Sequence, residues 1–256
     1  MMRLSFPTLA RRARSAFRPA FVTAGVTGAL VTVGLVGSAC SYGMHGSGRV
    51  TTEVRAASDF TRVRIESGFP SDIGVGPRTV DVTIDDNLQR YVDPVVGSET
   101  LLVRERPGMG LSFSEGTMIR VRSELIERVE LVGGCSAHAE ANGDTVTFTS
   151  TGGSHLDGVV TKASRVDVTS SGSSDVALHG IGAEIHLDVS GASHFTTDIE
   201  AESVEIDASG GSAIVVHASK SVRVRASGAS DVTIIGNPAT RDVTTSGGST
   251  VRFVDE

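Results

Sequence analysis

A recurring pattern of apolar and polar positions fills the second half of the chain. Seven short Gly/Ser-rich segments occur there, and their leading glycines stand 18–20 residues apart: Gly133, Gly152, Gly172, Gly191, Gly210, Gly228 and Gly247. The residue four places before each leading glycine is apolar, and its two neighbours are mostly polar. Such alternation is typical of a β-strand with one buried face. Repetition at a fixed short interval is typical of a solenoid, in which each repeat forms one coil.

The positions on either side of the bend predict two columns of inward-facing side chains. The column before the bend consists of Val129, Phe148, Val168, Leu187, Ile206, Val224 and Val243. The column after the bend begins with His138 and continues with Leu156, Val176, Phe195, Ile214, Val232 and Val251. We therefore expect parallel coils of about 19 residues over 126–254, stacked at the strand spacing of about 4.8 Å.

The bends themselves predict close stacking of small residues. Glycine reaches backbone angles that other residues avoid, and only small side chains fit where one bend lies on the next. The residues expected to stack there are Cys135, Gly153, Ser173, Ala192, Gly211, Ala229 and Gly248. A serine follows each of them, which predicts a ladder of hydroxyl groups able to satisfy bend amides. Cys135 is interpreted as a small packed residue, because no neighbouring cation in the sequence would activate its thiol.

Residues 50–130 show short alternating segments without obvious helices. Alternation at 62–66, 80–84 and 118–122 predicts strands, and 85–88 and 107–110 interrupt the pattern as loops. The fold class that follows is all-β: a single-stranded parallel β-solenoid (β-helix), preceded by an irregular β region.

The N-terminus has the features of a secretory signal. Five arginines and no acidic residue precede an uncharged run over 19–39, which ends in Gly37-Ser38-Ala39-Cys40. Small residues before a cysteine resemble a bacterial lipobox, in which the cysteine receives the lipid, although Gly37 stands where leucine is usual. Cleavage by ordinary signal peptidase after Ala39 and a retained membrane anchor are the alternatives. The predicted organisation is a signal peptide over 1–39, a tether over 40–48 and a solenoid domain over 49–256.

Charge and cysteine content narrow the possible partners. Without residues 1–39 the chain has 18 basic and 30 acidic residues, a net charge of −12, and its only lysines are Lys162 and Lys220. Such a surface is a poor partner for nucleic acid or anionic lipid. Cys40 and Cys135 are the only cysteines, so lipidation of Cys40 leaves no disulfide framework. The expected partners are the membrane, through the N-terminal lipid, and a protein or glycan ligand at the cell surface.

One set of residues could bind a metal ion. His155, Asp175 and His194 each follow a ladder serine and are 20 and 19 residues apart, so three consecutive coils would present them on one edge. Two imidazoles and a carboxylate suit a divalent transition metal, whereas the simpler interpretation is that they are polar turn residues. We predict no cofactor.

Catalytic motifs are not evident in the sequence. It contains no nucleophile elbow, HExxH motif or phosphate loop, and the bends explain the many serines. Some polysaccharide-degrading enzymes use β-solenoids, but fold analogy alone does not confer activity.

An ordered series of motifs resembles a known family. The series consists of Gly46-Ser47-Gly48, Phe60, Ser67-Gly68, Asp86-Asn87-Leu88 and the serial Ser-Gly-x-Ser-Asp copies. Over roughly residues 46–250 the chain resembles the DUF2807 family, the "putative auto-transporter adhesin head GIN domain". The resemblance implies a β-helical, exported, often lipid-anchored bacterial protein with no defined activity. The chain departs from the family pattern at Phe69-Pro70 and at His155 and His194, where aspartate is usual.

Two function classes follow. The first is an exported module at the outer face of the cell membrane, with an adhesin-like or structural role and no enzymatic activity. The second is a carbohydrate-active or metal-dependent enzyme on a β-helix scaffold. A cleft with converging acidic groups would favour the second class, and flat faces would favour the first.

Overall fold

The structure is a computed structural model that describes residues 42–255. The predicted signal peptide and Cys40 lie outside the described residues. The described chain is almost entirely β-structure, with a single turn of 3-10 helix at Gln89–Tyr91. The predicted all-β solenoid with coils of about 19 residues is confirmed. Within residues 42–255 no helix has the length and apolar character needed to cross a bilayer.

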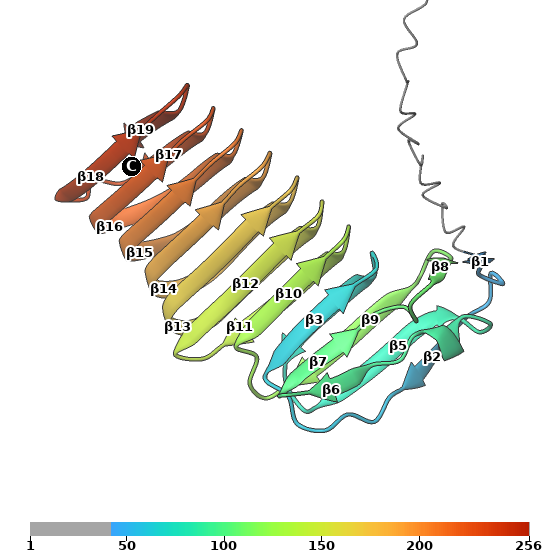
Figure 1. The fold of residues 1–256 in the computed structure, drawn as a ribbon. Coiled ribbons are helices and arrows are strands. Elements are labelled where there is room, and N and C mark those ends of the chain that lie inside the picture. Colours follow the sequence, from blue (N-terminus) through green and yellow to red (C-terminus); the bar gives the residue numbers. More distant parts are fainter. Residues whose placement is uncertain (1–41, 256) are drawn as a thin grey trace, which may run out of the picture. The chain divides into compact units, whose positions relative to one another are not determined.

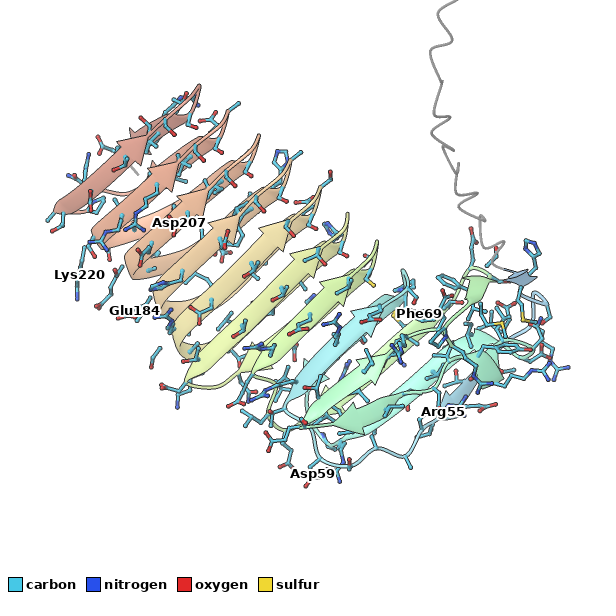
Figure 2. All side chains as sticks on the ribbon, in the orientation of Figure 1. Arg55, Asp59, Phe69, Glu184, Asp207 and Lys220 are labelled. Atoms are coloured by element: carbon cyan, nitrogen blue, oxygen red, sulfur yellow. The ribbon has the colours of Figure 1, made fainter. Side chains whose placement is uncertain are left out.

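From residue 128 onward the chain winds as a two-sheeted solenoid (Figure 1). We call the sheet formed by the strands before the Gly/Ser bends sheet A, and the sheet formed by the strands after them sheet B. In each coil the chain passes from sheet A through the bend into sheet B, and a corner then leads to sheet A of the next coil. Successive coils pair in parallel throughout this region. We call the edge with the Gly/Ser bends the bend edge and the opposite edge the corner edge. Asp59, Glu184 and Lys220 lie along the corner edge, and Asp207 lies on the outer face of sheet A (Figure 2).

Four long strands supply both sheets, because the chain stays extended around the corner. They are β13 (His155–Ser171), β14 (Asp175–Val189), β15 (His194–Ala208) and β16 (Ala213–Ala226). Sheet A also contains β10 (Arg128–Val132), β12 (Thr145–Thr151) and β18 (Thr240–Thr245). Sheet B also contains β11 (Ser136–Asn142), β17 (Asp231–Ile235) and β19 (Thr250–Val254).

The interior between the two sheets contains the predicted columns. Val168, Leu187, Ile206 and Val224 are in register on successive coils and are at most 3% exposed. The column after the bend is equally buried from Leu156 to Val232, but its first member is Ala137 and not the predicted His138. His138 faces outward, because the fourth residue after Gly133 is Ala137, which pairs with Leu156. The predicted column therefore began one residue too late in the first copy. On the last coil the prediction of buried columns is wrong, because Val243 is 40% exposed and Val251 is only partly buried where no further coil covers them.

The leading glycines are required by both backbone angle and space. All seven leading glycines have φ between +69° and +86°. A Cβ atom on Gly210 would lie 2.4 Å from the carbonyl oxygen of Gly191 in the bend below. Residues with a side chain rarely adopt this angle, and none fits at this distance.

The predicted serine ladder lines the inside of the bend edge. Ser154, Ser174, Ser193, Ser212 and Ser230 are buried, and each hydroxyl donates to the carbonyl oxygen three residues earlier at 2.8–2.9 Å. Two of the ladder hydroxyls also accept a hydrogen bond from an amide of the preceding coil, as predicted for the bend amides. The ladder therefore mainly adds a hydrogen bond to the carbonyl groups at the start of each bend, of which those of Thr151 and Ser171 also accept a backbone amide of the preceding coil.

Cys135 corrects the predicted register of the first bend. Ser136 pairs with His155, which puts Cys135 beside the ladder serine Ser154 and not in the column of Gly153. Its thiol takes the role of a ladder hydroxyl, since Sγ lies 3.3 Å from the carbonyl oxygen of Val132, three residues earlier. Burial raises the pKa of this thiol. The interpretation of Cys135 as a packed residue is consistent with this position, but the ladder begins one residue earlier than predicted.

Residues 42–125 form the base of the stack. β3 (Arg62–Glu66) and β4 (Pro70–Val75) pair in parallel with β10 and β11, and β7 (Thr100–Val103) and β9 (Met118–Ser123) add one more layer. Three antiparallel strands then close the stack: β2 (Val50–Val54), β5 (Thr79–Asp85) and β6 (Val95–Gly97). A separate pair consists of β1 (Tyr42–His45) and β8 (Met109–Ser112).

The first bend accommodates the bulky residue that departs from the family pattern. Ser67 and Gly68 both have positive φ, at 68° and 72°. Phe69 follows in the column that Cys135 and the ladder serines continue, and it is fully buried. Its ring stacks on Phe113 with 5.4 Å between the centroids. A phenylalanine therefore ends the serine ladder at the base, where no hydroxyl is needed.

A buried carboxylate fixes the beginning of the described chain. Asp85 is fully buried and accepts hydrogen bonds from the Gly48 amide at 2.8 Å and from the amide and hydroxyl of Ser114 at 2.9 and 2.7 Å. Burial alone would raise the pKa of Asp85, but these hydrogen bonds outweigh it, and the pKa lies below its usual value. Asn87 adds two bonds, from the Ser47 amide and to the carbonyl oxygen of His45. The part of the predicted tether from Tyr42 onward is therefore bound to the domain.

Candidate functional site

The structure places the three candidate metal ligands in one outward-facing column of sheet B. His155, Asp175 and His194 are in register on consecutive coils, and His155 Nδ1 lies 3.5 Å from Asp175 Oδ2. Within residues 42–255, however, no three histidine, cysteine or carboxylate groups are arranged to hold a metal ion. Metal binding by this column stays a prediction, which calorimetry with zinc on the wild type and on the His155→Ala variant would test.

A second row of histidines and aspartates crosses the same face. His138 Nδ1 lies 3.1 Å from Asp157 Oδ2, Asp157 Oδ1 lies 3.7 Å from His179 Nε2, and His179 Nδ1 lies 2.8 Å from Asp198 Oδ2. We call these four residues the His/Asp row. Sequence reasoning missed it, although its members are 19, 22 and 19 residues apart, close to the length of one coil.

The last pair of the His/Asp row is the most strongly coupled. Its hydrogen bond to Asp198 raises the pKa of His179, and the negative charges of Asp198 and Asp157 act in the same direction. The same hydrogen bond lowers the pKa of Asp198. Because about half of each side chain is exposed to water, the row links the coils only weakly.

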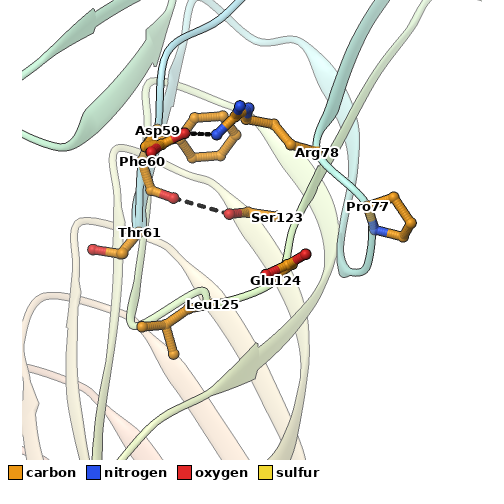
Figure 3. A pocket seen from close by; sticks show the side chains of 8 residues that line it. All are labelled: Asp59, Phe60, Thr61, Pro77, Arg78, Ser123, Glu124 and Leu125. Atoms are coloured by element: carbon orange, nitrogen blue, oxygen red, sulfur yellow. Dashed lines mark hydrogen bonds and ion pairs between the residues drawn. The ribbon is translucent and has the colours of Figure 1, made fainter.

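A hollow at the corner edge of the base is a candidate ligand site (Figure 3). Its volume is about 470 Å³, and its lining consists of Asp59, Phe60, Thr61, Pro77, Arg78, Ser123, Glu124 and Leu125. Arg78 forms an ion pair with Asp59, and the Ser123 hydroxyl donates to the carbonyl oxygen of Phe60 at 2.9 Å. The Phe60 ring is only 2% exposed, so polar groups make up most of the accessible wall.

A second hollow adjoins the first along the same edge. Its volume is about 590 Å³, and its lining consists of Leu125, Asn142, Gly143, Asp144, Thr161, Lys162, Ala163 and Ser164. Asn142 fixes the loop between the two hollows, because its side chain accepts from the Ile126 amide at 2.9 Å and donates to the carbonyl oxygen of Glu124 at 3.2 Å. Leu125 belongs to both hollows and is 38% exposed. We call the two hollows together the corner groove.

The corner groove offers contacts for binding. Its rim alternates in charge, with Asp59, Glu124 and Asp144 as acidic groups and Arg78 and Lys162 as basic groups, around one exposed leucine. Asp59 is paired with Arg78, and Asp144 accepts from the Ser164 hydroxyl at 2.8 Å. The lining contains no histidine or cysteine. Such a surface suits a ligand with several polar groups and one apolar group.

Comparison with known families assigns the chain. The sequence profile of DUF2807, described as "Putative auto-transporter adhesin, head GIN domain", matches residues 59–238. The chain belongs to this family. The resemblance drawn from the Gly/Ser motifs is thereby confirmed. In this DUF2807 protein, the Gly-Ser-Gly and Asp-Asn motifs meet in the contacts around Asp85, and Phe60 lies beneath the corner groove.

Solved structures share the fold of this DUF2807 domain. A "putative adhesin" from Bacteroides fragilis has a TM-score of 0.77 at 17% identity, covering 82% of this chain and 100% of that chain. A "putative adhesin" from Parabacteroides distasonis has a TM-score of 0.69 at 18% identity, covering 83% and 100%. A protein from the same organism described as "Putative lipid binding protein" has a TM-score of 0.67 at 16% identity, covering 83% and 99%. No curated protein shows significant sequence similarity to the chain.

Proposed function

We propose that this chain is an exported, lipid-anchored protein of the cell envelope that binds a protein or glycan at the cell surface. The observation that carries the binding role is the corner groove, in which charged and hydrogen-bonding groups of both signs surround the exposed Leu125. The adhesin-like family is consistent with display at a surface. The enzymatic alternative would need acidic groups that converge in a cleft; in the corner groove Asp59 is instead paired with Arg78 and Asp144 with the Ser164 hydroxyl.

The anchoring part of the proposal rests on the sequence before the domain. Cys40 follows Gly37-Ser38-Ala39 and stands two residues before β1. A diacylated Cys40 would hold the domain at the outer face of the cell membrane. Membrane fractionation tests this step: we expect the wild type in the membrane fraction and the Cys40→Ala variant released or unprocessed. A processed Cys40→Ala variant that stays on the membrane would contradict lipid anchoring.

The binding part is tested with immobilised glycans and purified surface proteins. We expect the wild type to bind a subset of the array and the Leu125→Arg variant to lose that binding. Ile181→Arg is the matched control, because Ile181 is also an exposed apolar residue, at 68%, but lies outside the groove. Binding that is equally sensitive to both changes, or that is absent in the wild type, would contradict a binding role of the corner groove.

A further inference from the structure

The charges of the chain divide along the stack. Residues 42–125 contain 10 basic and 12 acidic residues, whereas residues 126–256 contain 8 basic and 18 acidic residues. The base is therefore nearly neutral, and the negative charge resides in the coils. Of the net charge of −12, the base contributes −2 and the coils contribute −10.

Three arginines of the base stand on two neighbouring segments and form no ion pair within residues 42–255. Arg90, Arg104 and Arg106 are all exposed, and no carboxylate of residues 42–255 is within ion-pair distance of any of them. The Arg90 and Arg106 guanidinium groups lie 5.2 and 6.0 Å from the centre of the Tyr91 ring. By contrast, Arg120 and Arg122 in the same region are both paired with a carboxylate.

Two backbone contacts hold these residues next to one another. The Arg106 amide donates to the carbonyl oxygen of Tyr91 at 2.8 Å, and Val92 forms an antiparallel bridge with Glu105. Glu105 is turned away from the cluster, because its carboxylate accepts the Leu111 amide at 3.0 Å. The same bridge places Asp93 opposite Arg104, but no ion pair joins the two. We call Arg90, Tyr91, Arg104 and Arg106 the base patch.

The base patch lies next to the point at which the described chain begins. The Met109 amide donates to the carbonyl oxygen of Arg106 at 3.2 Å, and Met109 pairs with Tyr42 in the β1–β8 sheet. Tyr42 is two residues from Cys40 in sequence. A lipid on Cys40 would therefore have almost no free chain between it and this part of the domain.

We propose that the base patch contacts the phosphate groups of anionic phospholipids, so that the domain stands on the membrane with its acidic coils directed away. This inference rests on the proposed lipid anchor at Cys40. Guanidinium groups form paired hydrogen bonds with phosphate, and tyrosine is favoured at the membrane–water interface. Repulsion between the acidic coils and the anionic surface favours the same orientation.

Vesicle binding by the domain without its lipid tests the inference. Residues 41–256 suffice, because the described core and the residues packed against it all lie between Met44 and Phe253. We expect this fragment to sediment with vesicles of phosphatidylcholine and phosphatidylglycerol, but not with phosphatidylcholine alone, and to be released by salt. Replacing Arg90, Arg104 and Arg106 by glutamine should weaken the binding at least about tenfold, since each basic group near an anionic surface contributes several-fold.

The matched control removes the same charge from the far coils. Arg223, Arg225 and Arg252 are exposed arginines of those coils, and replacing them by glutamine should leave vesicle binding unchanged. Three results would overturn the proposed role of the base patch. The fragment could fail to bind phosphatidylglycerol vesicles, salt could fail to weaken the binding, or both triple variants could lose binding equally. Thermal melting establishes that each variant is folded. The lipid anchor is tested separately, by membrane fractionation of the Cys40→Ala variant. The two experiments therefore distinguish a wrong lipid anchor from a wrong base patch.

Discussion

The regular coils and the base pair their strands and bury their interior in different ways. From residue 128 onward, each coil repeats parallel pairing and a glycine of positive φ, and five of the bends also have a buried ladder serine. The base instead uses antiparallel strands and single buried polar groups, of which Asp85 and Gln89 are the clearest. A stack is thus stable through repetition in its middle, while its end needs contacts that occur only once.

The contacts of Gln89 illustrate why the base is irregular. Its amide nitrogen donates to the carbonyl oxygens of Thr51 and Val82, at 2.8 and 3.0 Å, and its oxygen accepts from Arg55. These bonds join β2, β5 and the 3-10 turn beneath the last parallel layer. An uncovered sheet end would leave unpaired backbone groups and an apolar interior exposed, and the antiparallel strands reduce that exposure.

The largest expected effect comes from a charge in the repeated core. Leu187→Asp puts a carboxylate between coils at a position that is 3% exposed. We expect the free energy of unfolding to fall by about 4 kcal/mol or more and cooperative folding to be lost. Thr196→Asp is the control, because Thr196 is exposed on the outside of a neighbouring coil. If Leu187→Asp melts like the wild type, the assignment of the inward column is wrong.

Adjacent glycines of one bend provide the second test. Gly210 has φ +79° and would bring a Cβ within 2.4 Å of the Gly191 carbonyl oxygen, whereas a Cβ on Gly211 would lie 4.0 Å from that oxygen. We expect Gly210→Ala to lower the free energy of unfolding by about 2–4 kcal/mol and Gly211→Ala to change it by less than about 1 kcal/mol. Denaturant unfolding measures both, and equal effects would contradict the stacking of the bends.

The third test removes the buried carboxylate of Asp85 in the base. Asp85→Asn replaces one accepting oxygen by an NH2 group that faces the hydrogen-bond donors of Gly48 and Ser114, and should cost about 2–3 kcal/mol of unfolding free energy at pH 7. Because the folded pKa of Asp85 is lowered, its contribution is present above the unfolded value of about 3.9 and is lost as the pH falls through the folded pKa. Asp81→Asn, on the same strand, is the control. If denaturant unfolding shows the two variants to be equally stable, Asp85 does not stabilise the base through its buried hydrogen bonds.

The sequence predicts the coils well because their structure is periodic. The glycine spacing and the alternation around Val168, Leu187 and Ile206 together define coil length, bend position and inward face. The base has no repeated segment, so only separate strands were predictable there, and neither the antiparallel closure nor the contacts of Asp85 followed. Cys135 was displaced by one position because Gly133 and Gly134 can both be aligned with a single glycine of the later bends. The pairings of Val129 with Phe148 and of Ser136 with His155 fix the register.

The candidate sites were harder to predict than the fold. The column of His155, Asp175 and His194 is in register as expected, but the corner groove and the base patch combine residues from separate loops. Leu125 and Lys162, for example, approach only because consecutive corners lie on one another. Such contacts have no local signal in the sequence.

The smallest expected effect is a pH dependence of the coils. The folded pKa of His179 is raised, so its ion pair with Asp198 contributes stability below the unfolded value of about 6.5, and this contribution is lost as the pH rises through the folded pKa. We expect His179→Gln to lower stability by less than about 1 kcal/mol near pH 5.5 and by still less at pH 8. His194→Gln, without such a pair in residues 42–255, should show no such difference. A His179→Gln effect that grows with pH would contradict the assignment.

Mass spectrometry of the N-terminal peptide tests the central claim of the account, that this solenoid is anchored to the outer face of the membrane by a lipid on Cys40. The protein is extracted from bacterial membranes with detergent, digested and analysed intact at its N-terminus. We predict a peptide that begins at Cys40 and has the mass of a diacylglyceryl-modified cysteine. A peptide that begins at Met1, or an unmodified peptide that begins at Cys40, would contradict the account.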